Sequence, residues 1–395
     1  MLENSNLGRR PAESLTAQFL FSAARGGTSI AEAAMLREDP LLLRLIGLKN
    51  AADENTLNAW FAGQTETSVQ ALRKLNVELV RAALQDLIPA RTGDATNAID
   101  VVMRTKSWDL SKTRNPIFDT SLAGNQLCWR TLAVGPFFLD GIWSLDPDHT
   151  EHCAQFEALV TSHRAIWRDH KTYFSSGDVP EGTLWKRVVD SAKLASWTAE
   201  LDRDRVYRGC NLDMDSPKLR WKEADSKDSF AQHYCCAYPG KDGQDIVPGV
   251  AVIARRKEAQ DQFYQHRFLL VPPRMESSAQ ACFARHFSVQ LAVDQMLDDL
   301  NLNRLIFLQG NAREASFAIA SLAYNLLTAL RLLLVPERHW TTREVIRSII
   351  TTPLTVSTSG RRDTGYLAVT PAWPAGWREL VESSMPGAGR RPPKR

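Results

Sequence analysis

The sequence predicts an α/β protein with a helical N-terminal domain, and three observations support this fold class. Apolar residues recur at helical spacing over residues 15–89. Residues 98–212 alternate β-branched or aromatic runs with amphipathic segments, the pattern of a mixed sheet covered by helices. Residues 213–275 alternate charged loops with short strand-like runs, which indicates a β-rich insertion before the chain returns to helices.

The composition sets limits on the function. The chain has 395 residues, enough for two or three domains, and 44% hydrophobic and 24% charged residues are usual for a soluble protein. A net charge of +3 does not by itself indicate nucleic-acid binding, which would need local clusters of cations. The longest apolar runs, 41–48 and 326–335, each contain an arginine and are too short for a bilayer, so we expect no membrane association. The N-terminus lacks an apolar signal segment and the six cysteines form no CxxC pair, which favours a cytoplasmic protein with reduced thiols.

The N-terminal segment contains recognisable helix boundaries. Asp39 and Pro40 predict a helix start, with the aspartate as cap and the proline at the first helical position. That helix is expected to stop near Gly47, and the next one to begin near Glu54 or Asn55.

A long amphipathic helix is expected over 68–88. Its apolar positions are Leu72, Leu75, Leu79, Val80, Ala83, Leu84 and Leu87. Residues 15–95 therefore form a helical domain, either with a DNA-binding helix-turn-helix or as a plain helical bundle.

The remaining elements follow from runs of strand-like or helical residues. Expected strands are 98–103, 127–134, 137–145, 184–190, 205–212, 230–240, 249–257 and 265–273. Expected helices are 154–171, 191–204, 279–300 and 313–335. The expected domains are a flexible 1–14, helical 15–95, a core in two parts (96–212 and 276–355) around the insertion 213–275, and a C-terminal extension 356–395 that ends in a disordered basic tail.

Several stretches together carry a family resemblance. Phe283, His286, Gln290 and Leu297 have the spacing of the Y-x2-R-x3-E-x6-K signature on the last core helix of insertion-sequence DDE transposases. Segments 29–61, 185–212, 265–273 and 313–334 are also similar to that family. The chain thus resembles the group known as transposase DDE domain, group 1, over roughly residues 15–350. The resemblance implies a ribonuclease-H-like mixed sheet core, interrupted by a β-rich insertion.

The resemblance also implies that the catalytic site is degenerate. Family members hold two divalent metals with three carboxylates and use them for phosphoryl transfer. The second carboxylate falls on Asp190, whereas the first falls on Val102 and the third on Gln290. The Tyr, Arg and Lys of the signature become Phe283, His286 and Leu297. One carboxylate cannot hold two hard cations, so we expect no catalytic residue, no metal and no cofactor.

Three functions remain open. The first is a catalytically inactive, domesticated relative of a mobile-element transposase, a DNA-binding or scaffolding pseudoenzyme whose partners are double-stranded DNA and protein subunits of a nucleoprotein complex. The second is an active enzyme using Mg²⁺ or Mn²⁺ in a rearranged site, rescued by Asp100 or Asp294. The third is a protein-interaction module. Candidate DNA-binding residues are Arg37, Asn55, Asn58, Lys218, Arg220, Lys222, Arg255, Arg256 and Lys257. Charge runs of this kind also occur simply as solvated surface.

Overall fold

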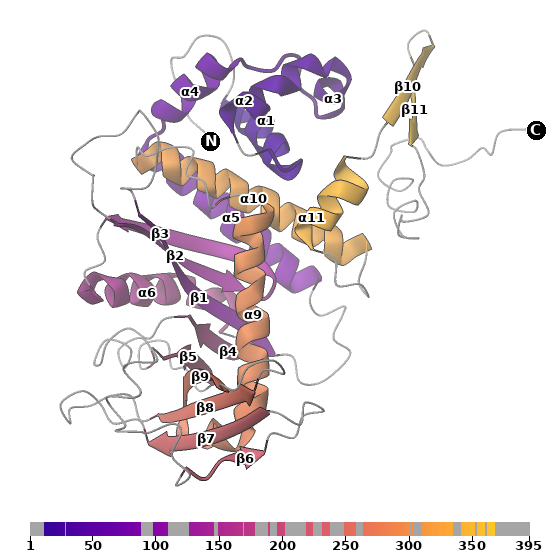
Figure 1. Cartoon of the computed structure of the whole chain (residues 1–395). Helices are drawn as coiled ribbons and strands as arrows, with labels where there is room; N and C mark the ends of the chain where they lie inside the picture. Colours follow the sequence, from indigo (N-terminus) through magenta and orange to yellow (C-terminus); the bar gives the residue numbers. More distant parts are fainter. Residues whose placement is uncertain are drawn as a thin grey trace, which may run out of the picture. The chain divides into compact units, whose positions relative to one another are not determined.

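The protein is described by a computed structural model in two compact units (Figure 1). Unit 1 comprises 1–93 and 294–395, and unit 2 comprises 94–293. The structure describes residues 12–27, 29–87, 98–109, 126–145, 149–168, 170–177, 189, 196–201, 219–223, 231–237, 249–257, 264–300, 302, 310–334, 341–351, 354–359 and 362–367.

Unit 1 is mainly helical, as the sequence predicts for its N-terminal part. Its helices are α1 (Ala12–Ala24), α2 (Ile30–Met35), the 3-10 turn η1 (Leu36–Glu38), α3 (Pro40–Leu45), α4 (Glu54–Ala62), α5 (Glu66–Asp86), α10 (Gly310–Leu334), α11 (Thr342–Val345) and the π-turn η8 (Ile346–Ile350). A hairpin of β10 (Leu354–Ser359) and β11 (Arg362–Leu367) follows. Helix α10 packs against α1, α4 and α5 and supplies Ala315, Ile319 and Leu322 to one core with Phe19 and Leu72.

The expected helix start at Asp39 is confirmed. The backbone N–H of Leu42 donates to Oδ1 of Asp39 at 2.9 Å, and α3 begins at Pro40. The next cap is Asp53 rather than Glu54 or Asn55, because Oδ1 of Asp53 accepts from the backbone N–H of Thr56 at 2.7 Å.

Helix α5 buries four of the seven residues expected to face the core but differs from the prediction at position 75. Leu75 is 52% exposed, so the prediction that it faces the core is wrong. Asn76 is buried instead, and its Oδ1 accepts a hydrogen bond of 2.8 Å from Nδ2 of Asn325 on α10. A buried amide pair of this kind shifts the inward-facing stripe of the helix by one position, because a satisfied amide can replace an apolar side chain.

Helix α10 is long and apolar enough, over Gly310–Leu333, to cross a membrane by length and composition. In the structure 72% of that window is buried, as in the central helix of a protein core.

The described residues of unit 2 form a nine-stranded mixed sheet with the order β3-β2-β1-β4-β5-β9-β8-β7-β6. The strands are β1 (Ala98–Asp109), β2 (Gln126–Val134), β3 (Phe137–Leu145), β4 (Lys171–Ser176), β5 (Trp197–Glu200), β6 (Lys222–Glu223), β7 (Ala231–Ala237), β8 (Val250–Lys257) and β9 (Tyr264–Val271). Strands β1 to β3 are antiparallel, β4 and β5 run parallel to β1, and β9 returns antiparallel to β5. Helix α6 (His149–His163) lies in the chain between β3 and β4, and α9 (Ala279–Asp299) follows β9.

The strands expected at 98–103, 127–134 and 137–145 are confirmed, but the second half of the sheet differs from the prediction. Of the strand expected at 184–190 the structure describes only Val189, which is helical, and the parallel neighbour of β1 is β4. The helix expected over 191–204 is also wrong, because Trp197–Glu200 forms β5. Trp197, Thr198 and Ala199 are all buried, and a strand covered on both faces shows no alternating pattern by which to recognise it.

The strands within 213–275 continue the main sheet. Strand β9 pairs with β5 on one side and with β8 on the other, so β6 to β9 extend the sheet that begins with β3. Helices α9 and α10 confirm the expectations for 279–300 and 313–335.

Candidate functional site

Three adjacent strands bring polar side chains to one face of the sheet. The register pairs Asp100 with Tyr173 and Val102 with Ser175, and it pairs Ser175 with Thr198. Because alternate residues of a strand share a face, these five residues lie on the same side. Helix α9 covers this side, since its residues bond to Asp100, Ser175 and Thr198.

His286 of α9 lies at the centre of this face and is fully buried. Its Nδ1 is 2.8 Å from Oγ of Ser175 and 2.8 Å from Oγ1 of Thr198. The hydroxyl of Tyr173 donates to the same Oγ1 of Thr198 at 3.0 Å. Nε2 of His286 is 3.9 Å from Oε2 of Glu200, which is longer than a hydrogen bond. The proximity of this carboxylate favours a proton on Nε2, which leaves Nδ1 to accept hydrogen bonds from the hydroxyls.

Burial lowers the pKa of His286 below its ordinary value of 6.5, against the opposing effect of Glu200. Arg104 lowers the pKa further through its positive charge. The imidazole is therefore neutral around pH 7, in agreement with the role of Nδ1 as an acceptor.

Arg285, the residue before His286, binds the only aspartate on this part of β1. Its Nε donates to Oδ1 of Asp100 at 2.6 Å, and its NH2 lies 2.6 Å from the same oxygen. The guanidinium also stacks over the ring of Tyr173, 4.4 Å from the centroid. Burial raises the pKa of Asp100 despite the hydrogen bond and charge of Arg285, and burial likewise raises the pKa of Tyr173.

These residues form a hydrogen-bonded network. The carboxylate of Asp100 is already neutralised by Arg285, while Val102 is 1% exposed and packs against Ala133. Within the described ranges, no group of three or more His, Cys, Asp or Glu residues could hold a metal ion. Ser175 and His286 have no exposed surface, so their hydroxyl–imidazole pair is closed to a substrate and acts as a link between α9 and the sheet.

The signature positions on α9 have several environments. Phe283 is buried in an apolar cluster with Val252, Leu269 and Cys282, and burial raises the pKa of Cys282 to about 11. Leu297 is buried, in the part of α9 that belongs to unit 1.

The described region omits part of the predicted site. Asp190 lies outside it, and so does the side chain of Gln290, although its backbone is part of α9. Asp294 is exposed.

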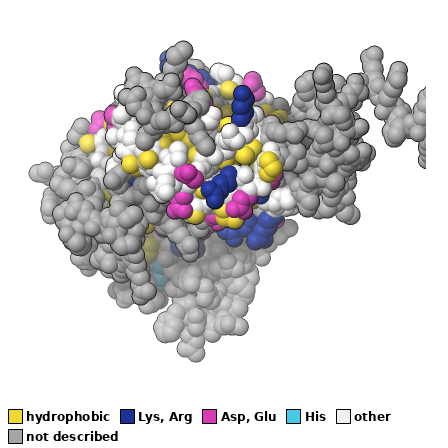
Figure 2. All heavy atoms as spheres, turned by 90° about the horizontal axis from the view of Figure 1, so that it is seen from above, with side chains coloured by type: hydrophobic (Ala, Val, Ile, Leu, Met, Phe, Trp, Pro, Cys, Tyr) yellow, Lys and Arg dark blue, Asp and Glu magenta, His cyan; other side chains and the backbone are white. Residues whose placement is uncertain are grey.

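The candidate DNA-binding residues of unit 1 are exposed but lie among acidic neighbours. Arg37 lies in η1, and Asn55 and Asn58 are one turn apart on α4. In segment 32–54 the described exposed carboxylates are Glu32, Glu38, Asp39, Asp53 and Glu54 and the described exposed cations are Arg37 and Lys49; the side chain of a third cation, Arg44, lies outside the described residues. Figure 2, which views the side of α1 to α4, shows acidic and basic side chains next to one another among apolar ones. This segment therefore lacks the cationic excess that phosphate binding needs.

Two of the candidate cations of unit 2, Lys222 and Arg255, lie on opposite faces of the sheet. Lys222 pairs in register with His233, whereas Arg255 pairs with Gln232, so Lys222 and Arg255 point to opposite faces of the sheet. Arg255 donates to Oε1 of Gln232 from Nε at 2.9 Å and from NH2 at 2.6 Å, and its guanidinium lies 4.0 Å from the ring centroid of Trp221.

The remaining cations can be placed only in part. Arg220 is exposed, as is Lys222. Lys218 lies outside the described residues, and so do the side chains of Arg256 and Lys257 in β8.

Sequence analysis did not identify Ser175, Thr198, Glu200 or Arg285 as members of the site. Three of them stand at alternating positions in the short strands β4 and β5, where a hydroxyl or carboxylate among buried neighbours is the only signal. Their partners are far apart in the chain, since Ser175 and His286 are separated by 111 residues.

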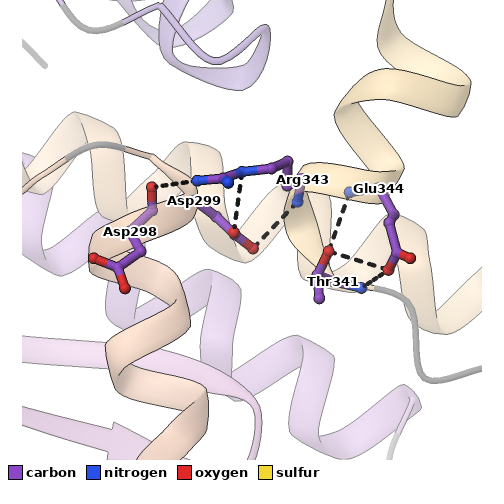
Figure 3. Close-up of polar contacts among 5 residues, drawn as sticks. All are labelled: Asp298, Asp299, Thr341, Arg343 and Glu344. Atoms are coloured by element: carbon purple, nitrogen blue, oxygen red, sulfur yellow. Dashed lines mark hydrogen bonds and ion pairs between the residues drawn. The ribbon is translucent and has the colours of Figure 1, made fainter.

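A second polar link was also unexpected and lies in unit 1 (Figure 3). The backbone N–H of Arg343 donates to Oδ2 of Asp299 at 3.2 Å, and its NH2 donates to the carbonyl oxygen of Asp298 at 3.1 Å. Thr341 caps α11 by accepting from the backbone N–H of Glu344, and the Glu344 carboxylate accepts in return from the backbone N–H of Thr341 at 2.6 Å. These contacts join the end of α9 to the start of α11.

No protein-family model matches the chain, and no curated protein is significantly similar to it in sequence. Function must therefore be inferred from the strand order and from the side chains of the site.

Proposed function

We propose that this protein is a catalytically inactive relative of the DDE transposases, with a ribonuclease-H-like core, that binds or scaffolds DNA. The observation that carries the proposal is the register pair at the centre of the sheet. Where β1 and β4 lie side by side under α9, the paired residues are Val102 and Ser175, and neither can supply an anionic oxygen to a metal.

The strand order supports the fold part of the proposal. An antiparallel β1–β2–β3 meander followed by a helix, with β4 and β5 added parallel to β1, is the arrangement expected of a ribonuclease-H-like core. In such sheets, chemistry is found near the carboxyl ends of the parallel strands. Ser175 and Glu200 occupy those ends of β4 and β5.

The charge pattern of the site supports the loss of catalysis. Two-metal phosphoryl transfer needs several carboxylates converging on an open position. Asp100 is hydrogen-bonded to Arg285, and Glu200 is next to a buried imidazole. A protein cation thus takes the place beside Asp100 that a metal would need, which also argues against Asp100 as a rescuing ligand.

The test of inactivity is a cleavage and strand-transfer assay. Supercoiled and linear duplex DNA is incubated with the protein in Mg²⁺ or Mn²⁺, with EDTA as the blank. We expect no metal-dependent product. Metal-dependent cleavage that is lost in Asp190→Asn would establish the active-enzyme alternative.

DNA binding is tested separately by gel shift over a salt series. Neutralised phosphates make affinity fall with salt, by a log–log slope of about −0.9 for each phosphate contacted on duplex DNA. Arg220→Gln with Lys222→Gln should flatten this slope, while Asn55→Ala should alter sequence preference only. Glu66→Gln on α5 serves as the exposed control. If the protein shifts no DNA duplex even at low salt, the proposal that it binds DNA is wrong.

A protein-interaction module is the second candidate, and the acidic segment α2–α4 favours it. Carboxylates outnumber cations there, and Met35 is 58% exposed beside them. Such a surface repels phosphates and suits a partner with a basic, partly apolar face. If gel shifts are negative, co-purification with wild type but not with Met35→Asp would support this function.

A further inference from the structure

A buried polar contact joins α9 to the two parallel strands β4 and β5. His286 is the only residue of α9 for which the described contacts show hydrogen bonds to both strands. Its single Nδ1 lies 2.8 Å from each of the two hydroxyl oxygens, and in the Nε2–H tautomer that Glu200 favours this nitrogen accepts hydrogen bonds from the hydroxyls. We call Ser175, Thr198 and His286 the imidazole latch.

Protonation of the ring would change this arrangement. An imidazolium donates from both nitrogens, so Nδ1 can no longer accept from either hydroxyl. The oxygen of Thr198 already accepts from Tyr173, and the Ser175 hydroxyl would have to reverse its direction. One link between α9 and the sheet is therefore weakened when the ring gains a proton.

The charges around the ring determine what replaces that link. Strand β5 contributes Glu200, 3.9 Å from Nε2 and 39% exposed, and β1 contributes Arg104, whose charge opposes protonation. Helix α9 contributes Arg285, and β1 also contributes Asp100, which that arginine already binds. Tyr173 on β4 is neutral, because burial raises its pKa, and Cys282 on α9 is neutral for the same reason. Among the described residues, Glu200 is thus the anion that partly offsets the free-energy cost of charging the buried ring.

We propose that the imidazole latch is a pH-sensitive device that holds α9 on β4 and β5 when His286 is neutral and loosens this contact on acidification. The inference is independent of DNA binding.

The direction of the effect follows from linkage. The pKa of His286 in the folded protein lies below that of the unfolded chain, about 6.5. The stabilising contribution is complete above pH 6.5 and is lost as the pH falls toward the folded pKa. Over that interval the opening equilibrium rises by up to about tenfold per pH unit. Asp100 acts in the opposite direction, because a raised carboxyl pKa makes protonation favour the folded state.

Hydrogen exchange of the full-length protein tests the inference, as protection factors for peptides within 279–289 between pH 7.5 and 5. We expect protection to fall below pH 6.5 in the wild type and to be independent of pH in His286→Gln. His170→Gln, at an exposed histidine, is the control and should behave as the wild type.

Glu200→Gln keeps the imidazole ring and removes its counter-ion. This variant provides the test if His286→Gln does not fold. Without the carboxylate the charged ring is less tolerated, so acid opening should be steeper than in the wild type. Flat protection in the wild type, an unchanged pH dependence in His286→Gln, or a weaker acid response in Glu200→Gln would each overturn the proposal.

Discussion

Val102→Asp restores a carboxylate at the position where the resemblance places the first metal ligand. Its effect on stability shows whether the surrounding residues can still bind a metal ion. Val102 is 1% exposed and packs against Ala133. Losing a buried valine side chain costs about 1.5–3 kcal/mol. Burying an unpaired carboxylate adds several kcal/mol, even after relaxation, because the charge leaves water.

The two costs predict that Val102→Asp lowers the free energy of unfolding by at least about 4 kcal/mol in EDTA. This is a large fraction of the roughly 5–15 kcal/mol that stabilises an ordinary protein. Val102→Thr has nearly the same shape and adds only a hydroxyl, with a cost of about 1–3 kcal/mol. The difference between the two variants isolates the charge.

The assay is urea unfolding of both variants and the wild type, in EDTA and in Mg²⁺. If the aspartate created a metal site with a dissociation constant of about 1 mM, about 10 mM Mg²⁺ would restore roughly 1.4 kcal/mol. We expect no such restoration, because the register partner of the position is Ser175, whose hydroxyl is neutral, and the nearby carboxylate of Asp100 is already bound by Arg285. Restoration specific to Val102→Asp, or a cost in EDTA no larger than that of Val102→Thr, would refute the reasoning.

Three further predictions concern the core of unit 1, each measured by urea unfolding. Gln18 is 1% exposed, donates to the carbonyl oxygens of Ala33 and Ala52 at 2.9 Å each, and accepts from the N–H of Ala52 at 2.7 Å. Gln18→Met should therefore cost about 3 kcal/mol or more, whereas Gln70→Met on the exposed face of α5 should change stability by less than about 0.5 kcal/mol; equal costs would contradict this. Asn325→Leu leaves Asn76 without its 2.8 Å donor and should cost about 1–3 kcal/mol, and a second change, Asn76→Leu, should recover part of it. Additive losses in the double variant would show that the pair is not coupled. Asp53→Ala removes the cap of α4 and should cost about 1 kcal/mol, with Asp53→Asn nearly neutral.

The helices were the most predictable part of the fold, because their signals are local. Asp39 and Pro40 mark a start by capping chemistry, and the structure begins α3 there. Strands β1, β2 and β3 could be predicted equally well, since each is a long run of β-branched or aromatic residues. Strand β5 was missed because four residues are too few to show a periodic pattern. Three of the four are buried, so apolar and polar positions do not alternate.

Only part of the site could be predicted from the sequence. Spacing singled out His286 and the neighbourhood of Asp100, but as remnants of a family pattern. Their actual partners, Ser175 and Arg285, depend on which strand lies beside β1, and that is decided by pairing across long stretches of chain. Of the strand expected to end at Asp190 the structure describes only Val189, which is helical; residues 171–176 form the parallel neighbour of β1, a choice made by tertiary packing.

The division of the chain has a consequence for how the protein is made. The core of unit 1 combines Phe19, Leu57 and Leu72 from the N-terminal helices with Ile319 and Leu322 of α10, and the whole of unit 2 lies between them in the chain. On the ribosome, the first helices emerge long before the helix that completes their core. Unit 2 has all its strands in one continuous stretch and can collapse earlier. The apolar faces of α1, α4 and α5 therefore remain exposed until α10 has been synthesised. We expect the chain to bind chaperones and to aggregate more readily during this interval than after folding is complete.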